Sequence, residues 1–252
     1  MARFILIHGA WHDARAWERV VPVLLARGHS VETPDLPGNG RDATPAREVS
    51  LATYVDHIER ILVAKPDPAI LVGHSMAGIV LSSVAERLPE RLAALVYVAA
   101  FMLPTGLSMV RFYELYGEPW MKGARVHLQQ SADGSYSTMP QAAARQVFFN
   151  CCDDQTAAAA SAHLGPMPSQ PRRDAVEITA ARWGRLPRFY GRTLRDETVF
   201  PQLQDRMLAL SPGTATHDFD TDHSPFYSTT DEFNDWLDGI ARSKTAGTQI
   251  PS

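Results

Sequence analysis

The sequence predicts an α/β protein in which a mostly parallel central sheet is flanked by helices. Short apolar runs alternate with stretches of helical spacing along much of the chain, and this alternation is typical of parallel strands joined by helical crossovers. The 252 residues are 45% hydrophobic and 21% charged, which suits one large domain with a full core. A serine also stands between an apolar run and a helical stretch, within residues 69–87, as it would on a strand-to-helix turn.

The first elements follow from apolar runs and their boundaries. A strand is predicted over 3–7, because residues 4–7 are a continuous apolar run. A helix is expected over 14–27, because apolar side chains recur there at spacings of three and four, and Gly28 ends it. Residues 30–34 predict a short strand, and a turn rich in Pro, Gly and Asn follows it.

The middle of the chain continues the alternation. A helix is expected over 50–64, with Ser50 as its N-cap. The apolar run 69–73 predicts the strand that leads to the serine, and 76–87 predicts the helix that follows it. Another strand is expected over 92–100.

The regular pattern then stops and returns only near the C-terminus. Residues 102–186 contain aromatic, Ala-rich and Pro-rich stretches without a strong buried strand, and this length exceeds that of a simple connection. We expect a helical cap over the carboxyl edge of the sheet. Strands are expected over 188–193 and 214–219, and a helix over 230–241. The predicted division is a core in two parts (1–101 and 187–242), a cap (102–186) and a disordered tail (243–252).

Composition argues against several other functions. The formal net charge is −4 and no basic run is present, so no nucleic-acid partner is expected. No segment is apolar for long enough to cross a membrane, and the N-terminus begins with a strand rather than a signal peptide. The two cysteines, Cys151 and Cys152, are adjacent, and adjacent cysteines rarely form a disulfide with each other. This predicts a reducing, cytoplasmic setting. No Cys/His spacing suits a metal, and neither a metal nor another cofactor is expected.

Ser75 is the candidate nucleophile. Gly73-His74-Ser75-Met76 has the form of a nucleophile elbow, G-x-S-x-G, in which a tight turn exposes the serine above the sheet. The fifth position is Ala77 instead of Gly, and the Gly follows at 78. The alternative is a Gly-rich turn of an ordinary α/β protein, such as a phosphate loop, but no Lys follows the Gly as a phosphate loop requires.

A base and an acid follow in the chain order Ser, acid, His, which is the order of triads on this kind of turn. His223 lies in the loop directly after the last predicted strand and is the candidate base. Asp196 follows the strand 188–193 and is the candidate acid, with Glu197 as its main competitor. Asp222 is adjacent to His223 in sequence, so its side chain is expected to point away from the ring.

Two backbone N–H groups are expected to form an oxyanion hole. One belongs to Met76, the residue after the nucleophile, and the other to Ala10, in the loop after the first strand. Loss of one such donor typically lowers the rate by ~10²–10³.

Together these segments resemble α/β-hydrolases of the plant methylesterase and hydroxynitrile lyase group, and bacterial carboxylesterases that include pyrethroid hydrolases. The resemblance covers nearly the whole core and fades in the cap. The segments that carry it are His8-Gly9-Ala10-Trp11 with Trp17, Asp35-Leu36-Pro37-Gly38, Gly73-His74-Ser75-Met76, Ala99-Ala100-Phe101-Met102 and Asp222-His223-Ser224-Pro225-Phe226-Tyr227-Ser228.

The resemblance implies an α/β-hydrolase fold with a helical cap inserted after the sixth core strand. It implies a serine carboxylesterase that hydrolyses small-to-medium esters with an apolar or aromatic part, through an acyl-enzyme at Ser75. A hydroxynitrile lyase or a C–C bond hydrolase on the same triad is an alternative. The lyases of the group carry Thr where this chain has Gly9 and Lys where it has Ser224, so both positions favour hydrolysis. A receptor-like binding protein is a further alternative, which the complete triad disfavours.

The pocket is expected to be mostly apolar, because the cap is rich in aromatic residues and Met. A small-molecule ester is the expected partner, and the group makes a homodimer possible by analogy. The candidate substrate-binding residues are Gly9, Trp11, His12, Phe101, Tyr113, Trp120, Phe148 and Ser224.

Overall fold

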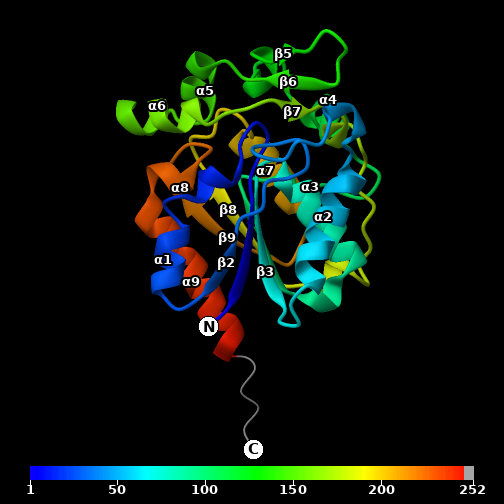
Figure 1. The fold of residues 1–252 in the computed structure, drawn as a ribbon, viewed down its shortest axis with the longest axis vertical. Coiled ribbons are helices and arrows are strands. Elements are labelled where there is room, and N and C mark those ends of the chain that lie inside the picture. The colour runs from blue at the N-terminus through cyan, green and yellow to red at the C-terminus, as the bar shows by residue number, and fades with distance from the viewer. Residues whose placement is uncertain (247–252) are drawn as a thin grey trace, which may run out of the picture.

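A six-stranded parallel sheet forms the centre of the protein (Figure 1). The computed structural model describes residues 1–246, with only the backbone described for 244–246. All five neighbouring pairs in the sheet run parallel, in the order β2-β1-β3-β4-β8-β9. The strands are β1 (Arg3–Ile7), β2 (Ser30–Glu32), β3 (Ala69–His74), β4 (Leu92–Val98), β8 (Arg188–Thr193) and β9 (Thr214–Phe219).

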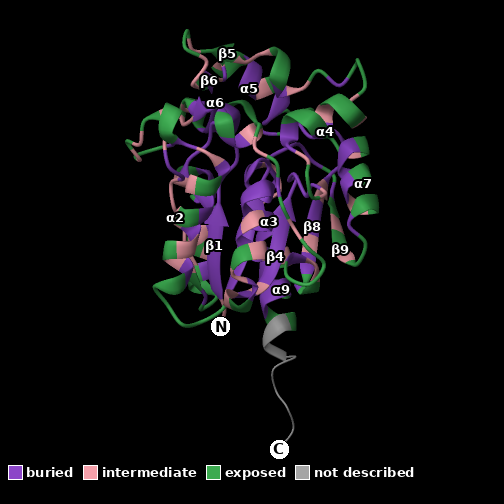
Figure 2. Cartoon of the chain, turned by 90° about the vertical axis from the view of Figure 1, so that its right-hand side faces the viewer, coloured by how far each residue is buried: buried purple, intermediate pink, exposed green. Residues whose placement is uncertain are grey.

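Helices cover both faces of this sheet. In Figure 1, α1 (Val21–Ala26) and α9 (Thr230–Ala246) lie on one side, and α2 (Leu51–Val63) and α3 (Ala77–Arg87) on the other. Every residue of β1 and β3 is buried, as Figure 2 shows for β1, so the continuous apolar runs of the sequence are strands covered on both faces. The predicted fold class is confirmed.

Two helix predictions have different outcomes. The predicted helix 14–27 is wrong as a single element: a 3₁₀ turn (Ala14–Trp17) comes first, capped by the Asp13 side chain, and α1 follows with Pro22 in its first turn. Pro favours a helix start because it lacks the N–H that an interior position requires. Ser50 caps α2 as predicted, since its hydroxyl accepts a hydrogen bond from the Thr53 N–H at 3.3 Å.

The insertion, residues 99–187 between β4 and β8, lies across the carboxyl ends of the strands (Figure 1). We expected the insertion to follow a sixth core strand. This expectation is corrected, because only four described strands precede the insertion. Besides α4 (Met109–Tyr116), α5 (Gln141–Val147) and α6 (Asp154–Ala162), it contains a small antiparallel sheet that the sequence did not predict. Its strands are β5 (Gln129–Gln130), β6 (Tyr136–Thr138) and β7 (Met167–Pro168).

The C-terminal part differs from the prediction in length. Along the chain, helix α7 (Pro201–Leu210) precedes β9 and the short helix α8 (Pro225–Ser228) follows it. Helix α9 extends to Ala246, so residues 243–246 are helical instead of disordered, and the rest of the predicted tail, 247–252, lies outside the described residues. No helix in the described part of the chain has both the length and the apolar character needed to cross a membrane.

Candidate active site

Ser75 stands on a sharp turn between β3 and α3. Its backbone has a φ of 54°, in the left-handed region that non-glycine residues rarely adopt. The Ser75 N–H donates to the carbonyl of Val98 and the Ser75 carbonyl accepts from the Phe101 N–H, both at 3.0 Å, so the neighbouring segment holds the turn in this conformation. The side chain is 6% exposed. This is the geometry of a nucleophile elbow.

The glycine displaced to position 78 has a packing reason. A Cβ atom built on Gly78 would lie 2.5 Å from the carbonyl oxygen of Phe101 and 2.8 Å from its carbonyl carbon. Helix α3 therefore passes so close to the segment after β4 that only glycine fits at this position. Ala77 is buried at the start of α3 and fits where the motif has its last Gly.

The strand order brings the loop after β1 beside this elbow. The chain passes from β1 to β2 on one side and then to β3 on the other, and ligands of open parallel sheets bind at such a reversal. Neither the Ala10 N–H nor the Met76 N–H has an acceptor among the described residues. One free donor therefore lies in the elbow itself, at Met76, and the other in the loop after β1, at Ala10.

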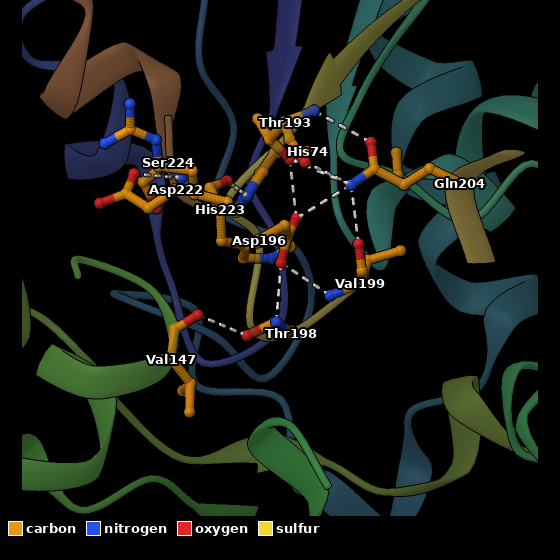
Figure 3. A network of polar contacts seen from close by, with 12 residues as sticks. His74, Val147, Thr193, Asp196, Thr198, Val199, Gln204, Asp222, His223 and Ser224 are labelled. Atoms are coloured by element: carbon orange, nitrogen blue, oxygen red, sulfur yellow. Dashed lines mark hydrogen bonds and ion pairs between the residues drawn. The ribbon is translucent and has the colours of Figure 1, made fainter. Parts of the chain in front are cut away.

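Asp196 and His223 form a buried pair after the last two strands (Figure 3). His223 Nδ1 lies 2.7 Å from Asp196 Oδ2, and both side chains are almost completely buried. With its proton on Nδ1, the ring presents Nε2 as a base. Glu197 is exposed, and so the carboxylate that contacts the imidazole is that of Asp196.

The elbow and this pair are joined through His74. His74 Nε2 donates to the His223 carbonyl oxygen at 2.9 Å, and the two ring centroids lie 4.5 Å apart. Among the described residues no hydrogen bond joins the Ser75 hydroxyl to the His223 ring. Such bonds commonly tighten only when a substrate is bound.

The Asp196 carboxylate is fixed by several donors that sequence reasoning missed. Oδ1 accepts from the N–H groups of Thr198 and Val199 at 2.7 and 2.8 Å, and Oδ2 from the Thr193 hydroxyl at 2.8 Å. The Gln204 amide, from α7, lies 3.4 Å from Oδ2 and also bonds both polar backbone groups of Thr193 (Figure 3). No sequence motif marks Gln204, because its role depends on how α7 packs against β8.

Asp222 holds the loop of His223 from the other side. Its Oδ2 accepts from the Cys151 N–H at 2.8 Å, and its Oδ1 accepts from the Ser224 N–H and the Ser228 hydroxyl. Burial raises the pKa of this carboxyl. As the sequence predicted, Asp222 points away from the His223 ring, and it ties the loop to the insertion.

Two further histidines are buried beside the elbow as neutral rings. Burial lowers the pKa of His12 to about 4, and burial, followed by the proximity of His223, lowers that of His74 well below its usual value. In the described residues His12 Nε2 and His74 Nδ1 have no hydrogen-bond partner. The ring of His12 packs against Phe148 and Phe149, so His12 packs the loop after β1 against the insertion.

A cavity of about 260 Å³ opens above Ser75. Three of the predicted substrate-binding residues, Trp11, Phe101 and Tyr113, line it together with Ala10. Sequence reasoning missed the remaining wall, which comes from the insertion and from the loop after β8. These residues are Met109, Val110, Glu114, Ala124, Arg125, Leu128, Arg172 and Thr198.

Five predicted substrate-binding residues do not line this cavity. Gly9 lies beneath the elbow, where an added Cβ would be 2.7 Å from His74 Nδ1. His12, Phe148 and Ser224 are buried in the packing around the His223 loop. Trp120 is 56% exposed and packs on Phe200 beside a separate surface depression. Aromatic content alone could not separate wall residues from core residues.

For the missed wall, the sequence offered one usable signal. Ser108 caps α4, and the buried Met109 and Phe112 lie one turn apart on it, so the start and inner face of this helix could have been read from the pattern. No set of three or more His, Cys, Asp or Glu side chains within the described residues is arranged to hold a metal ion.

Comparison with known proteins shows the family of the chain. Residues 4–236 match the family model described as the alpha/beta hydrolase family. The chain belongs to the alpha/beta hydrolase family. Similar solved structures include that of a pyrethroid hydrolase from Sphingobium faniae JZ-2, which is 27% identical, with a TM-score of 0.86 over 96% of this chain and 97% of that one.

Relatives of this alpha/beta hydrolase are named as esterases. Putative methylesterase 13, chloroplastic, of Arabidopsis thaliana is 28% identical over 95% of this chain and 56% of the relative. Esterase PIR7B of Oryza sativa subsp. japonica is 28% identical over 94% of this chain and 95% of the relative. The chain thus spans a little over half the length of the plant methylesterase.

Proposed function

We propose that this alpha/beta hydrolase is a serine carboxylesterase with Ser75 as nucleophile, His223 as base and Asp196 as the acid that orients the ring. The observation that carries the proposal is the buried 2.7 Å contact between His223 and Asp196, next to a serine with left-handed backbone. A serine with left-handed backbone could by itself be only part of a tight turn. A histidine that is oriented by a buried carboxylate adds the base that a serine hydroxyl needs.

The proposed reaction begins when Ser75 Oγ attacks the ester carbonyl carbon while His223 Nε2 takes the hydroxyl proton. The negative charge that develops on the carbonyl oxygen is stabilised by the N–H groups of Ala10 and Met76. The tetrahedral intermediate then expels the alcohol, which receives the proton from His223, and an acyl-enzyme remains. Water, deprotonated by the same nitrogen, attacks the acyl carbon, and the acid leaves as Ser75 is restored.

The cavity supports esters with an apolar part, because its walls near Ser75 are largely side chains such as Trp11, Phe101 and Met109. We infer that the insertion acts as the cap that shapes this space. Gly9 supports hydrolysis over the lyase alternative. An added Cβ there would be 2.7 Å from His74 Nδ1, so the threonine of the lyases does not fit without movement.

The test is burst kinetics with p-nitrophenyl acetate and p-nitrophenyl butyrate. We expect the wild-type protein to turn over both, and Ser75→Ala to lose at least about 10³-fold in kcat. Thermal unfolding of Ser75→Ala should match that of the wild type, which shows that the loss is chemical. Turnover that survives in Ser75→Ala would overturn the acyl-enzyme route, and a wild type inactive on all esters would overturn the esterase proposal.

A further inference from the structure

A guanidinium without an acidic partner lines the cavity above Ser75. It belongs to Arg172, at the end of a 3₁₀ turn (Gln170–Arg172) that follows β7 in the insertion. The side chain is partly buried, and it is a wall residue of the same cavity as Ser75. Most of the surrounding wall is apolar, so this cation stands out from its environment.

The contacts of Arg172 leave much of its hydrogen-bonding capacity unused. One Nη atom donates to the Ser137 hydroxyl at 3.3 Å, and the guanidinium carbon lies 5.6 Å from the centre of the Trp11 ring. The Nε atom is buried without a partner in the described part of the protein. A guanidinium carries five N–H donors, and no described carboxylate lies within 4.0 Å of this one.

Arg188 shows how this protein satisfies a buried arginine that has only a structural role. Its guanidinium donates to the carbonyl oxygens of Gly184, Leu186 and Pro212, which occupy both terminal nitrogens. Arg172 lacks such carbonyl partners. The second terminal nitrogen of Arg172 donates to no described residue and, unlike Nε, is not sealed from contact, so a group inside the cavity can pair with the terminal N–H groups.

The other charged residues of the cavity wall do not neutralise Arg172. Glu114 is exposed and pairs with Arg111 at 2.9 Å. Arg125 is exposed, donates to the Met121 carbonyl and lies over the Tyr113 ring. The wall therefore offers two cations and one acid that already has a partner.

We propose that the cavity selects esters that carry a carboxylate at the end remote from the reacting carbonyl, with Arg172 as the residue that binds this carboxylate. This inference rests on the proposed esterase function and names its substrate class: half-esters of dicarboxylic acids. Arginine binds carboxylate through two parallel N–H···O bonds, and the apolar surroundings strengthen them. Arg172 also packs on Trp11, which directly follows Ala10. This contact would hold the bound carboxylate in a fixed position relative to the oxyanion donors.

The experiment compares matched charged and neutral esters in a pH-stat. The substrates are monoethyl glutarate, adipate and suberate, each against the ethyl ester of the straight-chain monoacid with the same number of carbons. We expect the wild type to prefer the charged ester of the best-fitting length by about 10-fold or more in kcat/KM. Arg172→Met should remove this preference, chiefly through KM, with a loss of kcat/KM about 10-fold larger for the charged ester than for its neutral partner. Arg172→Lys should keep part of it.

Arg173→Met is the matched control, because Arg173 is the neighbouring, exposed arginine and does not line the cavity. It removes the same charge and should keep the preference. Equal losses on charged and neutral esters in Arg172→Met would overturn the inference and leave Arg172 a packing residue on Trp11. Absence of any preference in the wild type would overturn it too.

Binding to Ser75→Ala, measured by calorimetry, separates this inference from the esterase proposal. We expect monoethyl adipate to bind this variant at least about 10-fold more tightly than ethyl hexanoate, and the difference to vanish in Ser75→Ala/Arg172→Met. Selective binding without turnover by the wild type would contradict the esterase function alone. Turnover of neutral esters without selective binding would contradict the role of Arg172 alone.

Discussion

His223 Nδ1 and Asp196 Oδ2 lie 2.7 Å apart although the two residues are 27 positions apart in the chain. The strands that carry them are neighbours in the sheet, with Thr193 beside Phe219 at their carboxyl ends. The Arg195 N–H also donates to the Thr221 carbonyl at 2.9 Å, which holds the two loops together beyond the strands. The pair is therefore a product of strand order.

The first prediction concerns this carboxylate. Asp196→Asn should lower kcat for p-nitrophenyl butyrate by about 10³–10⁴-fold, because an amide favours the wrong tautomer of His223. Glu197→Gln should stay within about twofold, since Glu197 is exposed and makes no contact with the ring. Steady-state kinetics of the two variants decide which carboxylate is the acid. A larger loss in Glu197→Gln than in Asp196→Asn would show that the acid is misassigned.

The second prediction concerns Gly78. In Gly78→Ala the new methyl group would meet the Phe101 backbone at 2.5 Å, so we expect about 3 kcal/mol less stability in urea unfolding. The esterase kcat should fall as well, because the Phe101 N–H holds the Ser75 carbonyl.

Gly239→Ala is the control for that variant. Gly239 is an exposed residue of α9, and an added Cβ there meets no atom within 4 Å. Alanine should raise the stability by about 0.5–1 kcal/mol through its higher helix propensity and leave the activity unchanged. Equal effects of the two substitutions would contradict the close approach of α3 to the segment after β4.

The third prediction concerns the lyase alternative. Gly9→Thr should lower esterase activity and stability together, because the new Cβ would lie 2.7 Å from His74 Nδ1 and 3.0 Å from Ser75 Cβ. Cyanide release from mandelonitrile should stay at the uncatalysed level in the wild type and in this variant. Catalysed cyanide release that Ser75→Ala abolishes would favour the lyase function over the esterase function.

The fourth prediction is a pH dependence of stability. The native pKa of His12 is about 4, against 6.5 for an ordinary histidine, so the unfolded chain binds the extra proton between these values. The stability that depends on neutral His12 is complete above pH 6.5 and is lost as the pH falls toward 4. By pH 5 the loss should reach about 2 kcal/mol.

Urea unfolding of the wild type and His12→Gln at pH 7.5 and 5 measures this term. His8 and His74 also have lowered pKa values and contribute in both proteins, so the difference between the two losses of stability reports His12 together with its electrostatic effect on His74. The variant should lose less stability than the wild type on acidification. Identical losses would mean that the pKa of His12 is the same in the native and the unfolded protein.

Sequence reasoning succeeded where local pattern determines structure. The runs 188–193 and 214–219 are strands with the predicted boundaries, and Ser50 caps its helix as expected. These features depend on side chains within one segment, so the sequence alone contains the information. The elbow could be predicted for the same reason, since Gly73, Ser75 and Gly78 lie within six residues.

The insertion could not be predicted in the same way. The strands β5, β6 and β7 have two or three residues each, too few for an alternating pattern. Trp120 and Phe148 have similar chemistry, yet one is at the surface and the other is in the core. The positions of Arg172 and Gln204 depend on packing between segments that are far apart in the chain. No spacing of residues in the sequence indicates this packing.

Trp11 is attached to the insertion through two of its polar groups. Its indole Nε1 donates to the Ser137 hydroxyl at 3.2 Å, and its carbonyl accepts from the Gly165 N–H at 2.8 Å. A protein engineer who exchanges the insertion for that of a relative would thus also replace the supports of the loop that carries Ala10. We therefore expect selectivity and turnover to change together when the insertion is exchanged, and transplants that keep Ser137 and Gly165 should preserve more activity than whole-segment exchanges.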